Sequence, residues 1–180
     1  IQHEAENNLI FGVTASIIAG RYESAYMSVL EADSNIIQVM LRTPPFPIQV
    51  SHMNGTPSPE QVEAVITEWD DVFGAELTGM GGPKDAVGAY AAAWQARHGV
   101  NAVKAMQMRI YRLTEVKPVV GVPGQLRRIT ADDAELVAQW IARFSEDTGT
   151  GDGDIDTARE TVDYALKADP AVRALYLWEV

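Results

Sequence analysis

Two spacings of hydrophobic residues alternate along the first 113 residues, one typical of strands and one typical of helices. Runs rich in β-branched and aromatic residues predict strands, whereas apolar residues three and four positions apart predict helices. A polar stretch at residues 31–35 separates the first two strands, which indicates a hairpin. The expected strands are 25–30, 36–41, 48–53, 76–80 and 103–113. The expected helices are 7–18, 59–73 and one that opens at Gly81-Gly82-Pro83 and runs through His98.

A second, shorter unit is expected after a Pro- and Gly-rich break. We place a first domain at 1–117, a linker at 118–125 and a second unit at 126–180. The expected elements of the second unit are a strand at 125–129, a helix after a capping box that begins at Thr130, a helix capped by Thr157, and a closing strand at 174–180. A unit of roughly 55 residues has a marginal core, and a final strand needs a partner.

The order of these elements predicts an α/β (α+β layered) fold. The sheet is expected to be mixed, mostly antiparallel and flanked by helices, and the second unit to be incomplete. We expect that the last part of the chain depends on a further segment or on packing against the first part.

Composition excludes several classes of function. The formal charge is −11, which argues against a protein that binds nucleic acid or an anionic membrane surface through basic residues. No apolar run approaches the length of a membrane span, and the start of the chain is acidic, unlike a signal peptide. The absence of cysteine excludes disulfides and fits a reducing compartment, so a cytoplasmic protein is expected.

Short motifs favour structural roles over chemistry. The turn Gly79–Lys84 lacks the third glycine of a dinucleotide loop, and the acidic loop 147–160 lacks the strongest ligands of a calcium loop. The three histidines lack metal-ligand spacing, so no metal site is expected. Two clusters of charged residues each have two possible roles.

The acidic cluster is either an acid/base pair or the charged end of a helix; it consists of Glu68, Asp70, Asp71 and Glu76. The basic cluster either contacts an anionic cofactor or offsets the acidic majority; it consists of Lys104, Arg109, Arg112, Lys117, Arg127 and Arg128.

Five segments together resemble two-part bacterial proteins of the GNAT acyltransferase superfamily. They are Glu6-Asn7-Asn8-Leu9-Ile10, Leu41-Arg42-Thr43-Pro44-Pro45-Phe46-Pro47, Met108-Arg109-Ile110-Tyr111-Arg112-Leu113, Gly121-Val122-Pro123-Gly124-Gln125-Leu126-Arg127 and Leu175-Tyr176-Leu177-Trp178-Glu179.

The resemblance implies that the first half is a degenerate GNAT-like domain. Residues 126–180 would be the first strand, two substrate-side helices and second strand of a catalytic domain. The family's cofactor loop, Arg/Gln-x-x-Gly-x-Gly/Ala, has no match, and the equivalent stretch 53–59 holds one glycine and two prolines.

The function expected from this resemblance is the N-terminal portion of an acetyl-CoA-dependent N-acyltransferase. The complete protein would transfer an acyl group to a small-molecule amine, with the cofactor loop beyond Val180, so this chain alone is expected to bind no cofactor and to be inactive. Phe144 and Trp178 are the candidates for lining the acceptor side, with core packing as the alternative role for both. No catalytic residue is assigned.

An alternative from another class is a non-catalytic binding or assembly module. In this interpretation the exposed final strand pairs with another chain, either in a homo-oligomer or with the missing C-terminal part.

Overall fold

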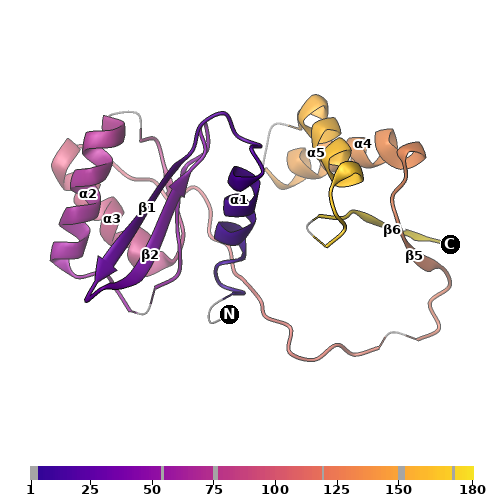
Figure 1. Cartoon of the computed structure of the whole chain (residues 1–180), viewed down its shortest axis with the longest axis horizontal. Coiled ribbons are helices and arrows are strands. Elements are labelled where there is room, and N and C mark those ends of the chain that lie inside the picture. Colours follow the sequence, from indigo (N-terminus) through magenta and orange to yellow (C-terminus); the bar gives the residue numbers. More distant parts are fainter. Residues whose placement is uncertain (1–3, 54, 75–76, 119, 150–152, 172) are drawn as a thin grey trace. The chain divides into compact units, whose positions relative to one another are not determined.

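The chain divides into two compact units, Ile1–Thr114 and Glu115–Val180, each with a hydrophobic core of its own (Figure 1). The computed structural model describes residues 4–53, 55–74, 77–118, 120–149, 153–171 and 173–180. Within the expected linker 118–125, the described residues before Gln125 belong to no helix or strand. Among the described residues, no helix combines the length and the apolar character that crossing a membrane requires.

Unit 1 is built on a mixed four-stranded sheet with the order β1-β2-β3-β4. The first three strands pair antiparallel, and β4 pairs parallel to β3 after the chain has passed through α2. The elements are α1 (Asn8–Ile18), β1 (Tyr26–Ala32), β2 (Asn35–Arg42), β3 (Ile48–Val50), α2 (Pro59–Phe73), β4 (Met80–Gly81) and α3 (Lys84–His98). Together with the small sheet of unit 2, this confirms a layered α+β fold with a mixed sheet.

The hairpin of β1 and β2 turns more tightly than expected. Asp33 and Ser34 have φ angles of 51° and 62°, so the loop is two residues long and not the five-residue stretch 31–35. Two consecutive left-handed residues form the turn whose twist matches that of the flanking strands. Asn35 then donates a side-chain hydrogen bond to the Asp33 carbonyl at 2.9 Å, which stabilises the turn.

The start of α2 follows directly from its sequence. Ser58 accepts a hydrogen bond from the Gln61 backbone N–H, and the Gln61 side chain accepts one from the Ser58 backbone N–H. Pro59 occupies the first helical position, where its missing N–H costs nothing. Two otherwise unpaired donors are thereby satisfied within the helix end itself.

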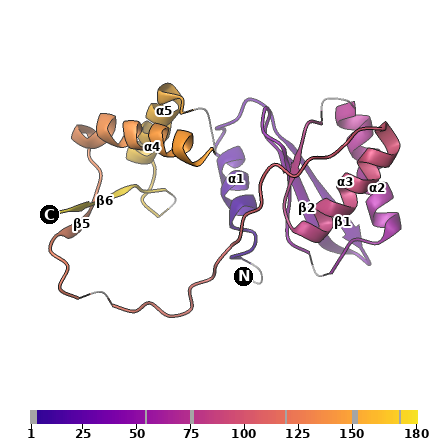
Figure 2. The same cartoon turned by 180° about the vertical axis from the view of Figure 1, so that it is seen from behind.

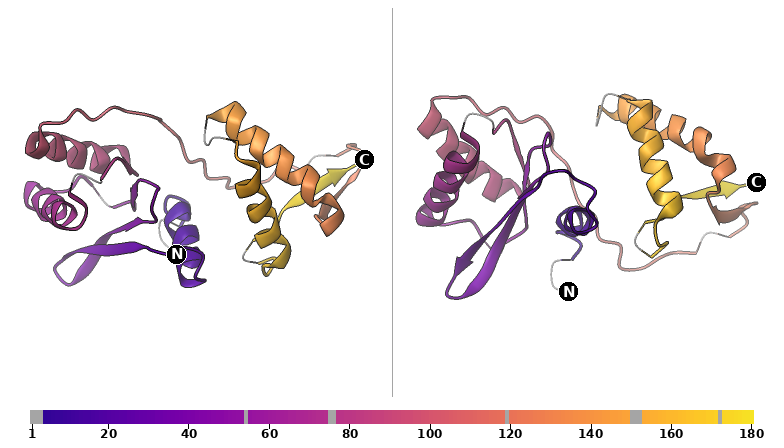
Figure 3. Two further views of the ribbon diagram at one scale, coloured as in Figure 1. Left: turned by 90° about the horizontal axis from the view of Figure 1, so that it is seen from above. Right: turned by 45° about the horizontal axis from the view of Figure 1, so that its top comes forward.

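The core of unit 1 lies between one face of the sheet and the pair α2 and α3. These two helices lie together on one side of the sheet and α1 lies on the other (Figure 2 and Figure 3). Trp69 of α2 meets Tyr90 of α3 edge-on, with ring centroids 5.2 Å apart. The buried residues come from β2, β3, the two helices and the connecting segments that contain Met53 and Leu77: Met40, Ile48, Val50, Met53, Val65, Ile66, Trp69, Leu77, Ala86, Tyr90 and Trp94.

A chain of hydrogen bonds crosses this core. The Tyr90 hydroxyl donates to the Gln38 side-chain oxygen, and the Gln38 amide donates to the Ser51 carbonyl at 3.0 Å. The Ser51 hydroxyl in turn accepts from the Val39 backbone N–H at 2.8 Å. Burial raises the pKa of Tyr90 to about 12, so its hydroxyl stays protonated and remains a donor at neutral pH. The chain ties α3 to both β2 and the residue that follows β3.

Unit 2 places two helices against a two-stranded antiparallel sheet. In chain order its elements are β5 (Gln125–Arg128), the 3-10 turn η2 (Ala131–Asp133), α4 (Ala134–Thr148), α5 (Ile155–Lys167) and β6 (Tyr176–Glu179). Its buried residues are Ile129, Val137, Ala138, Ala142, Ala158, Val162 and Ala165, of which four are alanine. Most of them are small, so the two helices can approach closely.

The cap of α5 differs from the prediction. The helix begins at Ile155 with Asp154 as N-cap, not at Thr157. The Asp154 carboxylate accepts from the backbone N–H groups of Asp156 and Thr157, and also from the Thr157 hydroxyl. Aspartate and threonine are both good caps, and a carboxylate that can accept three bonds satisfies more donors.

The expected strand at 103–113 is wrong. Residues 101–113 belong to no helix or strand and are exposed throughout. Hydrophobic alternation shows that a segment can be a strand, but a strand forms only where another edge exchanges backbone hydrogen bonds with it. No described residue supplies such an edge to this segment.

Replacement of Tyr90 by phenylalanine tests the buried hydrogen-bond chain. The variant leaves the Gln38 oxygen buried without its donor, so unit 1 should lose about 1–3 kcal/mol of unfolding free energy. Denaturant unfolding followed by tryptophan fluorescence measures the loss. Tyr111→Phe is the matched control, because Tyr111 is exposed. An equal, small effect of both changes would contradict the structural role of the bond.

Candidate functional site

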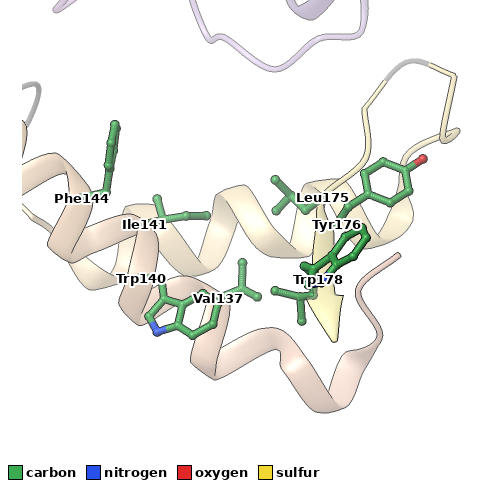
Figure 4. Close-up of a pocket in the computed structure, with 8 residues that line it drawn as sticks. Val137, Trp140, Ile141, Phe144, Leu175, Tyr176 and Trp178 are labelled. Carbon is green, nitrogen blue, oxygen red and sulfur yellow. The ribbon is translucent and has the colours of Figure 1, made fainter. Parts of the chain in front are cut away.

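An open apolar pocket lies between α4 and β6 in unit 2. It has a volume of about 540 Å³, and the side chains around it are all aliphatic or aromatic (Figure 4). They are Val137, Trp140, Ile141, Phe144, Leu175, Tyr176, Leu177 and Trp178. Ligand sites in proteins are typically concave and lined in this way.

Helical spacing places the α4 residues in this pocket. Val137, Trp140, Ile141 and Phe144 stand three or four positions apart, which puts them on one face of the helix. Val137 is buried in the core of unit 2, whereas Trp140 and Phe144 are exposed. The stripe therefore begins inside the core and ends at the surface, and the pocket forms along its exposed part.

Both residues that the sequence singled out lie in this pocket. Phe144 is 64% exposed and Trp178 is 54% exposed, so neither packs in the core. Phe144 stands at one end, and Tyr176 and Trp178 stand at the other (Figure 4). The two residues thus mark the length of the pocket and are not in one cluster.

Two exposed aromatic residues of the pocket were missed from the sequence. Trp140 precedes Phe144 by one helical turn, and Tyr176 precedes Trp178 by two strand positions. The signal that could have identified them is the period of each element, because residues i and i+4 of a helix, or i and i+2 of a strand, share a face.

The linker end holds the Trp178 indole. Its Nε1 donates to the Pro123 carbonyl at 3.0 Å. Gly124 follows with a φ angle of 109°, and a Cβ there would lie 2.5 Å from the Glu179 carbonyl oxygen and 2.6 Å from Trp178 Nε1. The indole keeps its position only because this residue has no side chain.

Arginine side chains fix β5 beside the pocket. Arg127 donates to both oxygens of Asp133 at 2.7 and 2.9 Å, and to Glu179 at 3.1 Å. This guanidinium, with hydrogen bonds from Thr130, holds the pKa of the Asp133 carboxyl well below its usual range. Arg128 donates to the carbonyls of Ala165 and Ala168 at 2.8 and 3.1 Å, at the end of α5. These two cations are therefore structural.

The remaining basic candidates lie outside the pocket. Lys104, Arg109, Arg112 and Lys117 belong to the exposed segment without helix or strand. Lys104 comes within 3.3 Å of the Gln107 side-chain oxygen. The cluster expected around the linker thus divides into two structural arginines and four exposed cations.

The acidic run at the end of α2 also has structural partners. Glu68 accepts from the Tyr26 hydroxyl at 2.5 Å, and Asp70 lies 3.8 Å from Arg97 and 3.3 Å from His98. Glu76 lies outside the described residues. Three or more potential metal ligands do not gather anywhere in the described part of the chain.

The stretch 53–59 does not fit a pyrophosphate. Pro57 and Pro59 lack N–H groups, and the Ser58 N–H is bonded to Gln61. The Ser58 hydroxyl is likewise engaged with the Gln61 N–H. Asn54 is outside the described residues. Among residues 55–59, only Gly55 and Thr56 have further backbone N–H groups, so this stretch lacks the run of amides with which a pyrophosphate loop grips acetyl-CoA.

Known proteins add no assignment to this geometry. No family model, no curated protein and no solved structure matches the chain.

The pair Arg127 and Asp133 makes unit 2 sensitive to acid. A carboxyl with a lowered pKa contributes stability that is present above its unfolded pKa near 4 and is lost as the pH falls through the folded value. The melting temperature of unit 2 should therefore fall as the pH drops below about 4. Asp133→Asn should lower it at neutral pH and flatten this acid dependence.

Asp132→Asn is the matched control, because Asp132 is a neighbouring exposed acid. Scanning calorimetry from neutral to acidic pH measures both variants. If Asp133→Asn has the same acid profile as the unchanged protein, the ion pair does not stabilise unit 2.

Substitution of Gly124 by alanine should disturb the pocket and unit 2 together. The Cβ has no room beside Trp178 and Glu179, and the φ angle is unfavourable, so a loss of more than about 1 kcal/mol is expected. Gly88→Ala is the control, because Gly88 lies inside α3 with no atom near its Cβ position and should gain about 0.5–1 kcal/mol. Denaturant unfolding measures the change in unfolding free energy of both variants, which should have opposite signs. A Gly124→Ala variant with unchanged unfolding free energy would contradict the close approach of Gly124 to Trp178 and Glu179.

Proposed function

We propose that this chain is part of an acetyl-CoA-dependent N-acyltransferase and that unit 2 supplies the acceptor side of its site. The supporting order is strand, two helices, strand, with β5 and β6 paired antiparallel. This is the order that the GNAT resemblance implies for the start of a catalytic domain. The observation that carries the proposal is the apolar pocket between α4 and β6, which contains both Phe144 and Trp178.

The pocket suits the apolar portion of an amine substrate. Aromatic faces of Trp140, Phe144 and Trp178 can contact such a group, and the open mouth leaves its amine in reach of solvent. Holding that amine in one place contributes to the rate by positioning.

Acetyl-CoA would supply the acyl group as a thioester. The stretch 53–59 does not fit its pyrophosphate, so the proposed role of the described residues is limited to binding and orienting the acceptor. No step of acyl transfer is assigned to a residue of this chain.

Amine-dependent thiol release by the complete protein tests this proposal. With acetyl-CoA and a panel of amines, free thiol should accumulate. Phe144→Ala and Trp178→Ala should each raise the KM of the amine about tenfold or more, because they remove apolar contacts with the acceptor, and leave the KM of acetyl-CoA unchanged.

Phe46→Ala is the control, since Phe46 is an exposed aromatic residue of unit 1. Absence of thiol release with every amine would refute the activity. Thiol release with unchanged amine KM in both pocket variants would instead refute the role of this pocket.

A further inference from the structure

Residues 101–113, here called the basic segment, combine an exposed backbone with an exposed apolar surface. Among them, Val103 is 86% exposed and Tyr111 is 81% exposed, and four further large apolar side chains are also exposed: Met106, Met108, Ile110 and Leu113. In an extended chain, Met106, Met108 and Ile110 fall on one side. A stripe of this kind on a protein surface indicates a contact with something else.

The charge of the basic segment is opposite to that of the unit that follows it. The segment contains Lys104, Arg109 and Arg112 and no acidic residue, whereas residues 115–180 contain thirteen acidic and seven basic residues. Acids follow both ends of the pocket along the chain, with Glu146 and Asp147 after Phe144 and Glu179 after Trp178. Asp147 pairs with Arg143 and Glu179 with Arg127, so the excess negative charge comes from Glu146 and from the net charge of the unit. A basic strand laid along the pocket would therefore meet complementary charge.

Unit 2 also offers a backbone edge beside that pocket. One edge of β6 pairs with β5, in the register Leu126 to Trp178 and Arg128 to Tyr176. The other edge has no strand partner within the described part of the chain. An unpaired edge next to apolar pockets is the surface to which extended peptides add as an extra strand.

We propose that the basic segment of one copy of this chain adds as a strand to the outer edge of β6 in a second copy. Because β6 has four residues, the paired part is short, and Met106 to Ile110 is its centre. The side chains of Met106, Met108 and Ile110 enter the pocket between α4 and β6. These side chains would fill the pocket that is assigned above to the acceptor amine, so the second copy and the amine compete for it. The dimer itself does not depend on the acyltransferase proposal.

The occupant is a second copy because the chain itself carries both complementary parts. Each copy has one basic segment and one pocket, so reciprocal exchange closes a two-fold dimer with no part left over. The two contacts together remove six large apolar side chains from water, namely Met106, Met108 and Ile110 of each basic segment. They also cover the exposed faces of Trp140 and Trp178, and buried aromatic residues are typical of interface centres.

The mass of the 180-residue chain in solution, over a wide range of concentration, tests this dimer. Light scattering and sedimentation equilibrium should show a dimer that dissociates on dilution. Ile110→Asp in the segment and Trp140→Glu in the pocket should each raise the dissociation constant at least tenfold, equivalent to about 1.4 kcal/mol. Ile18→Asp is the control, since Ile18 is an exposed apolar residue of α1, and it should leave the dimer unchanged.

Mixing the two weakened variants provides a sharper test. The Trp140→Glu copy has an intact segment and the Ile110→Asp copy has an intact pocket, so one of the two contacts can form. The mixture should therefore contain more dimer than either variant alone. Circular dichroism of each variant shows whether it has kept its fold.

Three results would overturn the inference. One is a chain that is monomeric at all concentrations, with fast amide hydrogen exchange across residues 103–113. Another is a monomer in which these amides are protected, because the segment then pairs with its own chain. The third is a dimer whose dissociation constant neither variant changes, because its interface then lies elsewhere.

Discussion

The hydrogen bond from the Tyr90 hydroxyl to the Gln38 side chain determines the geometry of unit 1, because both groups are buried and water cannot replace either partner. Through the Gln38 amide the same contact reaches the Ser51 carbonyl, and through the Ser51 hydroxyl it returns to the Val39 N–H of β2. The antiparallel register of β2 and β3 thus depends on a helix that comes more than thirty residues later in the chain. Since β4 pairs with β3, the parallel end of the sheet depends on it as well.

Unit 2 is organised by small side chains instead of a polar chain. Ala138 and Ala142 of α4 are buried together with Ala158 and Ala165 of α5. Alanines on the facing surfaces let the helices pack closely but leave no core volume for large residues. The large residues of the α4 stripe therefore remain at the surface, and the pocket beside β6 is a direct result of this distribution.

Local signals in the sequence predicted the elements best. The start of α2 was predicted from Ser58, Pro59 and Gln61, and the end of α3 was predicted from Gly99. Both predictions hold because caps act over only a few residues. The strand at 103–113 could not be judged in this way, since a strand requires a distant edge. At α5, Asp154 and Thr157 are both residue types that cap helices and they stand three positions apart, so the sequence offered two possible starts. For the pocket, Phe144 and Trp178 were named as candidates through the family resemblance, but their separation along the pocket required the fold.

Arg128 has a consequence beyond holding the strand in place. Its side chain spans from β5 to the last carbonyls of α5, and its backbone is paired with Tyr176 of β6. The final turn of α5 is thereby mechanically connected to the strand that borders the pocket. Because one guanidinium joins the two elements, a displacement of β6 would be transmitted through β5 and Arg128 to the last turn of α5, where amide hydrogen exchange would report it.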